Sequence, residues 1–162
     1  MKEAVATYVS RVAEKLRRQD SAATQMTVFV IEKALNKGDV YKPNEPINNH
    51  MILPVATSNT HDLLKPALHL LEQLVQPGVV YEKAGVILSQ LVPLHSVQQN
   101  LFAPATTVQQ QQLMKTLDNI NFSMRNEKVK FASSGTARPW KMKQEHLSKR
   151  YTTRWDELRE VN

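Results

Sequence analysis

The chain has 162 residues, 41% of them hydrophobic and 22% charged, which is the composition of a globular protein rather than a disordered or fibrous one. It has no cysteine, which excludes disulfides and thiolate chemistry and makes the cytoplasm the expected compartment. No apolar run approaches the roughly 20 residues that cross a bilayer, so no membrane partner is expected. The net charge is +6, and residues 113–162 hold eleven of the 21 Lys and Arg but six of the 15 Asp and Glu. This basic tail favours an anionic partner such as nucleic acid, although it can equally serve solubility.

The first predicted element is an α-helix over residues 2–19. Its apolar residues recur at spacings of three and four, as on one face of an amphipathic helix: Ala4, Val5, Tyr8, Val9, Val12, Ala13 and Leu16. Lys15, Arg17 and Arg18 fall in the last turn, where cations oppose the negative end of the helix dipole. The cluster can contact phosphates, while the simpler interpretation is a solvated helix end.

Two strands and a second helix follow. Residues 25–31 are rich in β-branched and aromatic side chains, which predicts a strand with both faces partly covered. Residues 51–56 predict a second strand, and Pro54 within it indicates an edge or a bulge, because proline cannot donate to a ladder. Apolar residues between Leu63 and Val75 predict a helix for which residues 58–60 offer caps. Pro66 within it predicts a kink or a start near Lys65.

Residues 79–91 predict a third strand with Gly85 in its middle, which indicates a bulge or a close backbone approach. Alternation along the strand divides its side chains between two faces. One set is expected to cover the helices: Ala84, Val86 and Leu88. The other set is expected on the open face: Lys83, Gly85, Ile87 and Ser89.

The order helix, strand, strand, helix, strand predicts an α+β domain over residues 1–92. Its antiparallel sheet carries two helices on one face, as in a β-α-β-β-α-β unit that lacks its first strand. Residues 93–112 are predicted to form a linker, and residues 113–162 a small α+β tail unit with a helix from Leu113. In the tail, residues 128–132 and 140–142 predict a hairpin, and Trp140, Tyr151 and Trp155 are the expected apolar anchors. A unit this small is marginally stable, so we expect it to dock on the first domain or to order with a partner.

The sequence shows no set of catalytic groups. Phosphate-binding glycine loops, zinc-protease motifs and a cysteine nucleophile are absent. His61 and His69 alone could share a helix, and they are two turns apart, too far for one metal ion. Asp and Glu residues stand singly, whereas two-metal phosphoryl transfer needs clustered carboxylates. We therefore expect a binding module without metal or cofactor, and an enzyme with an unrecognised site is a weaker alternative.

The predicted linker contains a candidate binding peptide, formed by Gln98, Gln99, Asn100, Leu101 and Phe102. An extended segment can place two large apolar residues in a partner's pocket, while the Gln98 amide fixes the register by hydrogen bonds. The pattern arises by chance in roughly a few per cent of chains of this length. The alternative is that Leu101 and Phe102 pack on their own domain.

Motifs along the whole chain resemble those of UmuC-like, Y-family translesion DNA polymerases. The Gln-x-x-Leu-Phe pattern is similar to the pentapeptide with which bacterial DNA polymerases bind the sliding clamp. It follows AEKLR at residues 13–17 and YEKAGV at 81–86, in the order and spacing of the family's little-finger domain. Three further segments resemble the family's tail domain: LMKTLDNIN at 113–121, WKMK at 140–143 and LSKRYTTRW at 147–155.

The chain departs from the family in lacking the palm, fingers and thumb, with the carboxylates that bind Mg²⁺. The first strand of the little finger is missing too. The chain therefore looks like a carboxy-terminal fragment, or a truncated reading frame, with no polymerase activity of its own.

The resemblance implies that the open sheet face lies on DNA beside a lesion during SOS repair and mutagenesis, with contacts mainly to phosphates. The expected partners are DNA, the bacterial sliding clamp and, through residues 113–162, a polymerase accessory subunit. Lys83 is the first candidate DNA contact, and Gly85 would let a phosphate approach the backbone. The full set of candidates is Lys83, Gly85, Lys33, Thr57, Lys15, Arg17 and Arg18. A protein-interaction adaptor without a DNA role is the alternative, because residues 1–102 hold ten Lys or Arg against nine Asp or Glu.

Overall fold

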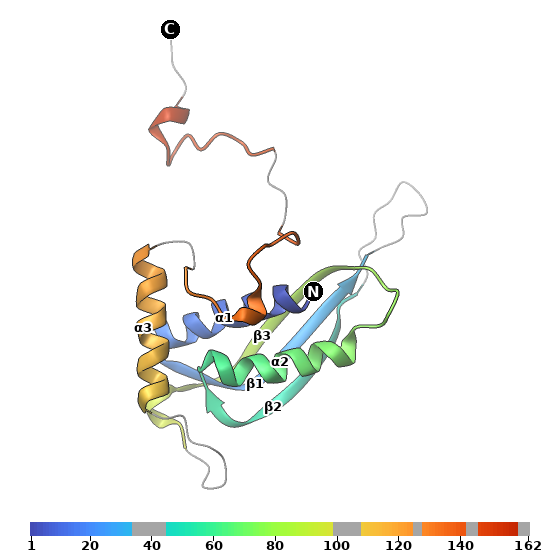
Figure 1. The fold of residues 1–162 in the computed structure, drawn as a ribbon, viewed down its shortest axis with the longest axis vertical. Coiled ribbons are helices and arrows are strands. Elements are labelled where there is room, and N and C mark those ends of the chain that lie inside the picture. The colour runs from blue at the N-terminus through green and yellow to red at the C-terminus, as the bar shows by residue number, and fades with distance from the viewer. Residues whose placement is uncertain (34–44, 99–107, 125–127, 142–145, 159–162) are drawn as a thin grey trace.

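The computed structural model describes residues 1–33, 45–98, 108–124, 128–141 and 146–158 (Figure 1). The chain is α+β, as the sequence predicts. Its helices and strands are α1 (Lys2–Arg18), β1 (Ser21–Glu32), β2 (Ile47–Thr57), α2 (Thr60–Leu74), β3 (Tyr81–Pro93) and α3 (Val108–Met124). Three short 3-10 turns are η1 (Leu94–Ser96), η2 (Ala132–Ser134) and η3 (Trp155–Glu157). Within these described ranges, no helix is long and apolar enough to cross a membrane.

The three strands form one antiparallel sheet in the order β2-β1-β3. Strands β1 and β2 extend beyond the predicted residues 25–31 and 51–56, because their pairing continues into flanking residues. Strand β3 has the predicted length but begins and ends two residues later than predicted. Pro54 lies in β2, at an edge of the sheet, which confirms the prediction made from that proline. In a central strand, proline would leave a ladder hydrogen bond unmade.

Helices α1 and α2 pack on one face of the sheet and form the core with it (Figure 1). From β1, Met26, Val28 and Val30 point into this core and are fully buried, each contributing about 1.5–3 kcal/mol. The alternation predicted for β3 is confirmed, because the expected residues pack against the same core: Ala84, Val86 and Leu88. The opposite face of the sheet is therefore the one that carries Lys83.

Helix α2 begins at its cap rather than at its proline. The side chain of Asn59 accepts a 3.1 Å hydrogen bond from the backbone N–H of His61, which satisfies one of the free donors of the first turn. Pro66 lies inside the helix, six residues after its first residue, Thr60. Of the two effects expected of Pro66, the start near Lys65 is therefore wrong.

Gly85 lies beneath the ring of Phe29 on the open face of the sheet. The two residues are paired in the β1–β3 ladder, and a Cβ added to Gly85 would overlap with Cζ and Cε1 of Phe29. The ring thus lies across β3 in the space that a side chain at Gly85 would take. The role of Gly85 as a place where a phosphate reaches the backbone stays a prediction, and the ring argues against it, since its outer end lies where a Gly85 side chain would be.

Gly85→Ala should destabilise the protein by about 1–3 kcal/mol, because the added methyl group forces the Phe29 ring to move. The same substitution should cost much less in a Phe29→Ala background. Urea unfolding of the four proteins measures both costs. An equal loss in the two backgrounds would show that the ring is not the obstacle.

The tail begins earlier and packs differently than predicted. Helix α3 starts at Val108, inside the predicted linker, and buries Met114 against the first domain. The predicted hairpin is wrong for residues 128–141, which contain no strand. Instead, the Asn121 side chain donates to the carbonyl of Val129 and accepts from its N–H, both at 2.9 Å. A side-chain amide thus takes the place of a strand partner.

The described tail contacts α1 through its middle part. Trp140 packs edge-on against Tyr8, with ring centroids 5.7 Å apart, as expected for an apolar anchor. Tyr151 and Trp155 are 44% and 90% exposed, so the structure does not use them as anchors. Turn η2 also lies against α1. Docking on the first domain was one of the two outcomes expected for the tail.

Candidate functional site

The open face of the sheet lies opposite α1 and α2 and is built from alternate residues of all three strands. Across one row, Thr27 pairs with His50 of β2 and Ile87 of β3, and across the next, Phe29 pairs with Asn48 and Gly85. Aliphatic side chains are well exposed here, with Ile52 at 70% and Ile87 at 51%. By strand alternation, the face comprises Gln25, Thr27, Phe29, Ile31, Asn48, His50, Ile52, Pro54, Lys83, Gly85, Ile87 and Ser89.

The charge of this face is concentrated at one end. Lys83 is exposed and pairs with Ile31 in the ladder. Lys33 is exposed two residues beyond Ile31, and its backbone N–H donates a 2.8 Å hydrogen bond to the carbonyl of Val80. The structure therefore brings these two predicted DNA contacts to the same end of the sheet. An extended anion that crosses the face can meet both.

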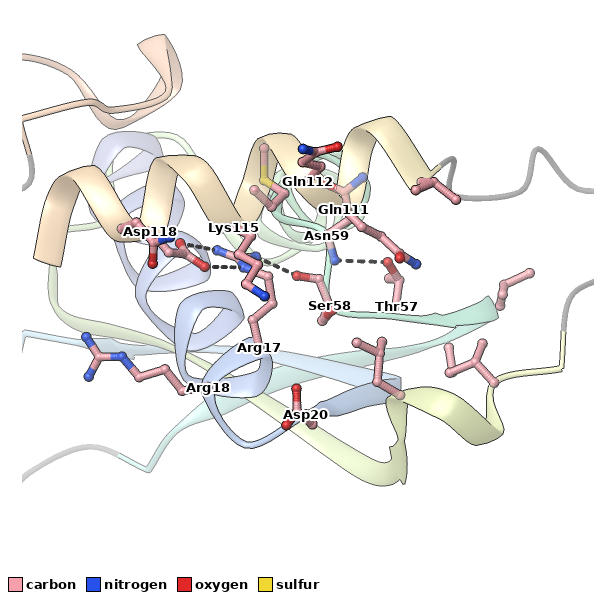
Figure 2. Close-up of a pocket in the computed structure, with 17 residues that line it drawn as sticks. Arg17, Arg18, Asp20, Thr57, Ser58, Asn59, Gln111, Gln112, Lys115 and Asp118 are labelled. Carbon is pink, nitrogen blue, oxygen red and sulfur yellow. Dashed lines mark hydrogen bonds and ion pairs between the residues drawn. The ribbon is translucent and has the colours of Figure 1, made fainter.

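Arg17 is bonded within the protein rather than presented to a partner (Figure 2). Its guanidinium donates to both carboxylate oxygens of Asp118, at 2.6 and 2.7 Å, and to the carbonyl of Ser58 at 2.6 Å. A further 3.0 Å bond reaches the hydroxyl of Thr60. The Arg17 side chain is 13% exposed. Its pair of parallel hydrogen bonds to Asp118 is a bidentate arginine–carboxylate interaction, which is a strong form of ion pair. The role of Arg17 as a DNA contact stays a prediction, and these bonds argue against it, because the donors of Arg17 hold α3 and the start of α2.

The rest of the cluster at the end of α1 also lies away from the open face. Arg18 donates 2.6 Å to Glu14 and lies over the ring of Phe122, 5.4 Å from its centroid. Lys15 is exposed on α1, which packs on the opposite side of the sheet from Lys83. These side chains therefore do not join Lys83 in one surface.

Thr57 is a capping residue at the β2–α2 junction. It is 9% exposed, its hydroxyl accepts a 3.1 Å hydrogen bond from the N–H of Asn59, and it donates 3.4 Å to Asp62. A buried hydroxyl that is already bonded on both sides is not placed to bind a phosphate. The role of Thr57 as a DNA contact stays a prediction that this burial and these bonds argue against.

A cavity of about 750 Å³ lies where α1, the end of β2, η1 and α3 meet (Figure 2). Arg17 and Asp118 form one wall, and Lys115 lies on the α3 side. Val97 and Val108 also line it. Sequence reasoning missed Asp118, because nothing in the pattern of α3 links it to a helix 101 residues earlier.

The predicted clamp peptide follows η1. Gln98 is exposed. Gln99, Asn100, Leu101 and Phe102 lie outside the described residues, and their role stays a prediction.

The described residues show no group of three or more His, Asp or Glu side chains that could hold a metal ion. Among the carboxyl groups of the described residues, that of Glu72 has a clear pKa shift: the ammonium of Lys2, at 2.6 Å, holds the pKa of Glu72 below its usual value. That exposed pair links α1 to α2 and is not part of the open face.

Comparison with known proteins identifies both parts of the chain. Residues 1–101 match the impB/mucB/samB family C-terminal domain, and residues 111–161 match a domain of unknown function, DUF4113. Protein ImpB of Salmonella typhimurium is 36% identical over 159 residues, which are 98% of this chain and 37% of that protein. Protein SamB of Salmonella typhimurium is 34% identical over 162 residues, 98% of this chain and 37% of the relative.

Protein UmuC of Salmonella typhimurium strain LT2 is 33% identical over 165 residues, which are 99% of this chain and 38% of UmuC. The chain thus spans little more than a third of the length of these curated relatives. The resemblance to UmuC-like proteins is confirmed. The match over residues 1–101, which contain the whole sheet with α1 and α2, shows that the chain belongs to the impB/mucB/samB family and carries its C-terminal domain.

Proposed function

We propose that the chain is the non-catalytic, DNA-binding and clamp-binding part of an error-prone translesion DNA polymerase of the UmuC type, acting in SOS repair and mutagenesis. The observation that carries the DNA role is the open sheet face, with Lys83 and Lys33 at one end and no described helix against it. The clamp role depends on the sequence of residues 98–102. The polymerase reaction, with its Mg²⁺, belongs to the palm, which this sequence does not contain.

In this proposal the sheet lies along the phosphate backbone and holds the template without reading its sequence. Lys83 and Lys33 supply the charge, and the remaining polar groups, such as those of Thr27 and Asn48, can bond to phosphate or sugar. Residues 113–162 carry the basic excess of the chain and are the proposed contact for a polymerase accessory subunit or for DNA.

A second candidate is an adaptor that binds the clamp or an accessory subunit without contacting DNA. The exposed aliphatic side chains of Ile52 and Ile87 favour it, because a face with few cations can also bind protein. Salt dependence separates the two, since each lost phosphate contact lowers the slope of log affinity against log salt concentration by about 1.

Lys83→Ala should weaken binding to a primer–template DNA severalfold and lower the salt slope by about 1. Lys65→Ala is the matched control, because Lys65 is exposed on α2, on the opposite side of the sheet. Fluorescence anisotropy over a range of salt concentrations measures both quantities. If the two variants behave alike, or if the wild-type chain does not bind DNA at low salt, the adaptor is the better description.

A further inference from the structure

The last described segment of the tail, residues 146–158, lies beyond the sheet and its helices (Figure 1). Four of its large apolar side chains are well exposed: Trp155 at 90%, Leu147 at 61%, Leu158 at 46% and Tyr151 at 44%. Trp155 has the largest exposed fraction among the large hydrophobic residues of the described chain. Because covering one face of the indole ring would remove a large part of that exposure, both faces of the ring are open to solvent.

The residues between Leu147 and Trp155 carry the groups that bind phosphate. They include three cations and three serine or threonine hydroxyls, and no acidic residue. All six side chains belong to exposed residues: Ser148, Lys149, Arg150, Thr152, Thr153 and Arg154. Cations interleaved with aromatic rings are typical of surfaces that bind single-stranded nucleic acid, with bases on the rings and phosphates on the cations.

Glu157 holds this segment in two consecutive turns. The backbone N–H groups of Thr153 and Arg154 donate to the carbonyl of Arg150, at 3.1 and 3.0 Å, and the turn η3 follows at Trp155. The Glu157 carboxylate accepts a hydrogen bond from the backbone N–H of Arg150 and lies 3.8 Å from the guanidinium groups of Arg150 and Arg154. These bonds fix the backbone around Trp155 before any partner binds, which lowers the conformational entropy that binding costs. Both arginine side chains remain about half exposed, so each can still meet a phosphate.

We propose that Trp155 stacks on an unpaired nucleobase, so that residues 147–155 are a binding segment for single-stranded nucleic acid. The indole supplies stacking, and the cations of the segment meet the phosphates on either side of the base. An apolar pocket of another protein is the other partner that an exposed indole fits, but a run of cations without an acidic residue favours nucleic acid. The inference rests on the proposal that the tail contacts DNA, and it names the segment and the kind of strand.

The test measures binding of the full chain to a short oligothymidine, and to the same oligonucleotide with abasic sites, by fluorescence anisotropy. Trp155→Leu keeps an apolar side chain without the aromatic ring and should weaken oligothymidine binding about tenfold, with an unchanged salt slope. Trp155→Phe keeps an aromatic ring and should bind within about threefold of wild type. Lys149→Ala should instead lower the slope of log affinity against log salt concentration by about 0.7, because it removes one phosphate contact on a single strand.

Tryptophan fluorescence reports the stacking directly. The chain has two tryptophans, and Trp140→Phe, which keeps a ring beside Tyr8, leaves Trp155 as the only one. Oligothymidine should quench the fluorescence of this variant, and the abasic oligonucleotide should quench it much less. Leu147→Ala is the control for loss of exposed apolar area in the same segment, and it should change the affinity little.

Equal weakening by Trp155→Leu and Leu147→Ala, or the absence of quenching by oligothymidine, would overturn the stacking role. Unchanged oligothymidine binding by Trp155→Leu would also overturn it and would leave a protein pocket as the partner for the ring. A blunt DNA duplex separates this result from the role proposed for the sheet. Wild type that binds the duplex but not oligothymidine overturns the inference alone, and wild type that binds oligothymidine but not the duplex overturns the role of the sheet alone. Failure to bind either ligand overturns both.

Discussion

Replacing Leu101 and Phe102 together by alanine should abolish measurable binding of the chain to a bacterial sliding clamp. Burying two such side chains in a partner's pocket contributes about 2–3 kcal/mol each. Ordering an extended peptide and losing rigid-body freedom consume much of the total, so we expect micromolar affinity for the wild type. Removal of both anchors then leaves too little free energy for a detectable complex.

Calorimetric titration of the wild type and the double variant into purified clamp measures this loss. Asn100→Ala is the matched control within the same peptide, and it should change the affinity little, because we expect the Asn100 side chain to face solvent when Leu101 and Phe102 fill the pocket. Circular dichroism gives the folding control. Equal binding by wild type and double variant would refute the clamp role, whereas loss of binding together with unfolding would show that Leu101 and Phe102 belong to the domain's own core.

Arg17→Ala should reduce the free energy of unfolding by about 2–4 kcal/mol and release α3 from α1. The substitution removes four hydrogen bonds and leaves the carboxylate of Asp118, whose side chain is 18% exposed, without its cation. Arg17→Lys should not rescue the loss, because a single ammonium group cannot reproduce the two parallel bonds to Asp118. Met114 should become exposed as α3 moves away.

Urea unfolding gives the stability, and amide exchange along α3 reports its release. Lys15→Ala is the control, since that cation is exposed on α1, and losing it should cost no more than about 0.5 kcal/mol. The double variant Arg17→Ala/Asp118→Ala should be more stable than the sum of the two single losses predicts. If Arg17→Ala costs no more than Lys15→Ala, or α3 keeps its protection, the ion pair does not hold the tail in place.

Only part of the candidate site could be predicted from the sequence. Alternation on β3 placed Lys83 on the open face correctly, because the two-residue period of a strand is a local property. Sequence reasoning could not show that the Thr57 hydroxyl is bonded in the β2–α2 junction or that the Arg17 guanidinium is bonded to α3. The residue type of a polar side chain does not show which hydrogen-bond partners that side chain already has in the folded protein.

The sequence by itself determined α1, the three strands, the edge position of Pro54 and the family, since periodicity, proline chemistry and motif order are all local signals. Only the tertiary structure decided that Phe29 lies over Gly85 and that Arg17 bonds to Asp118. Both contacts join segments that are far apart in the chain. The volume and charge of a side chain can select a partner only after the sheet and the helices have brought the two segments close together.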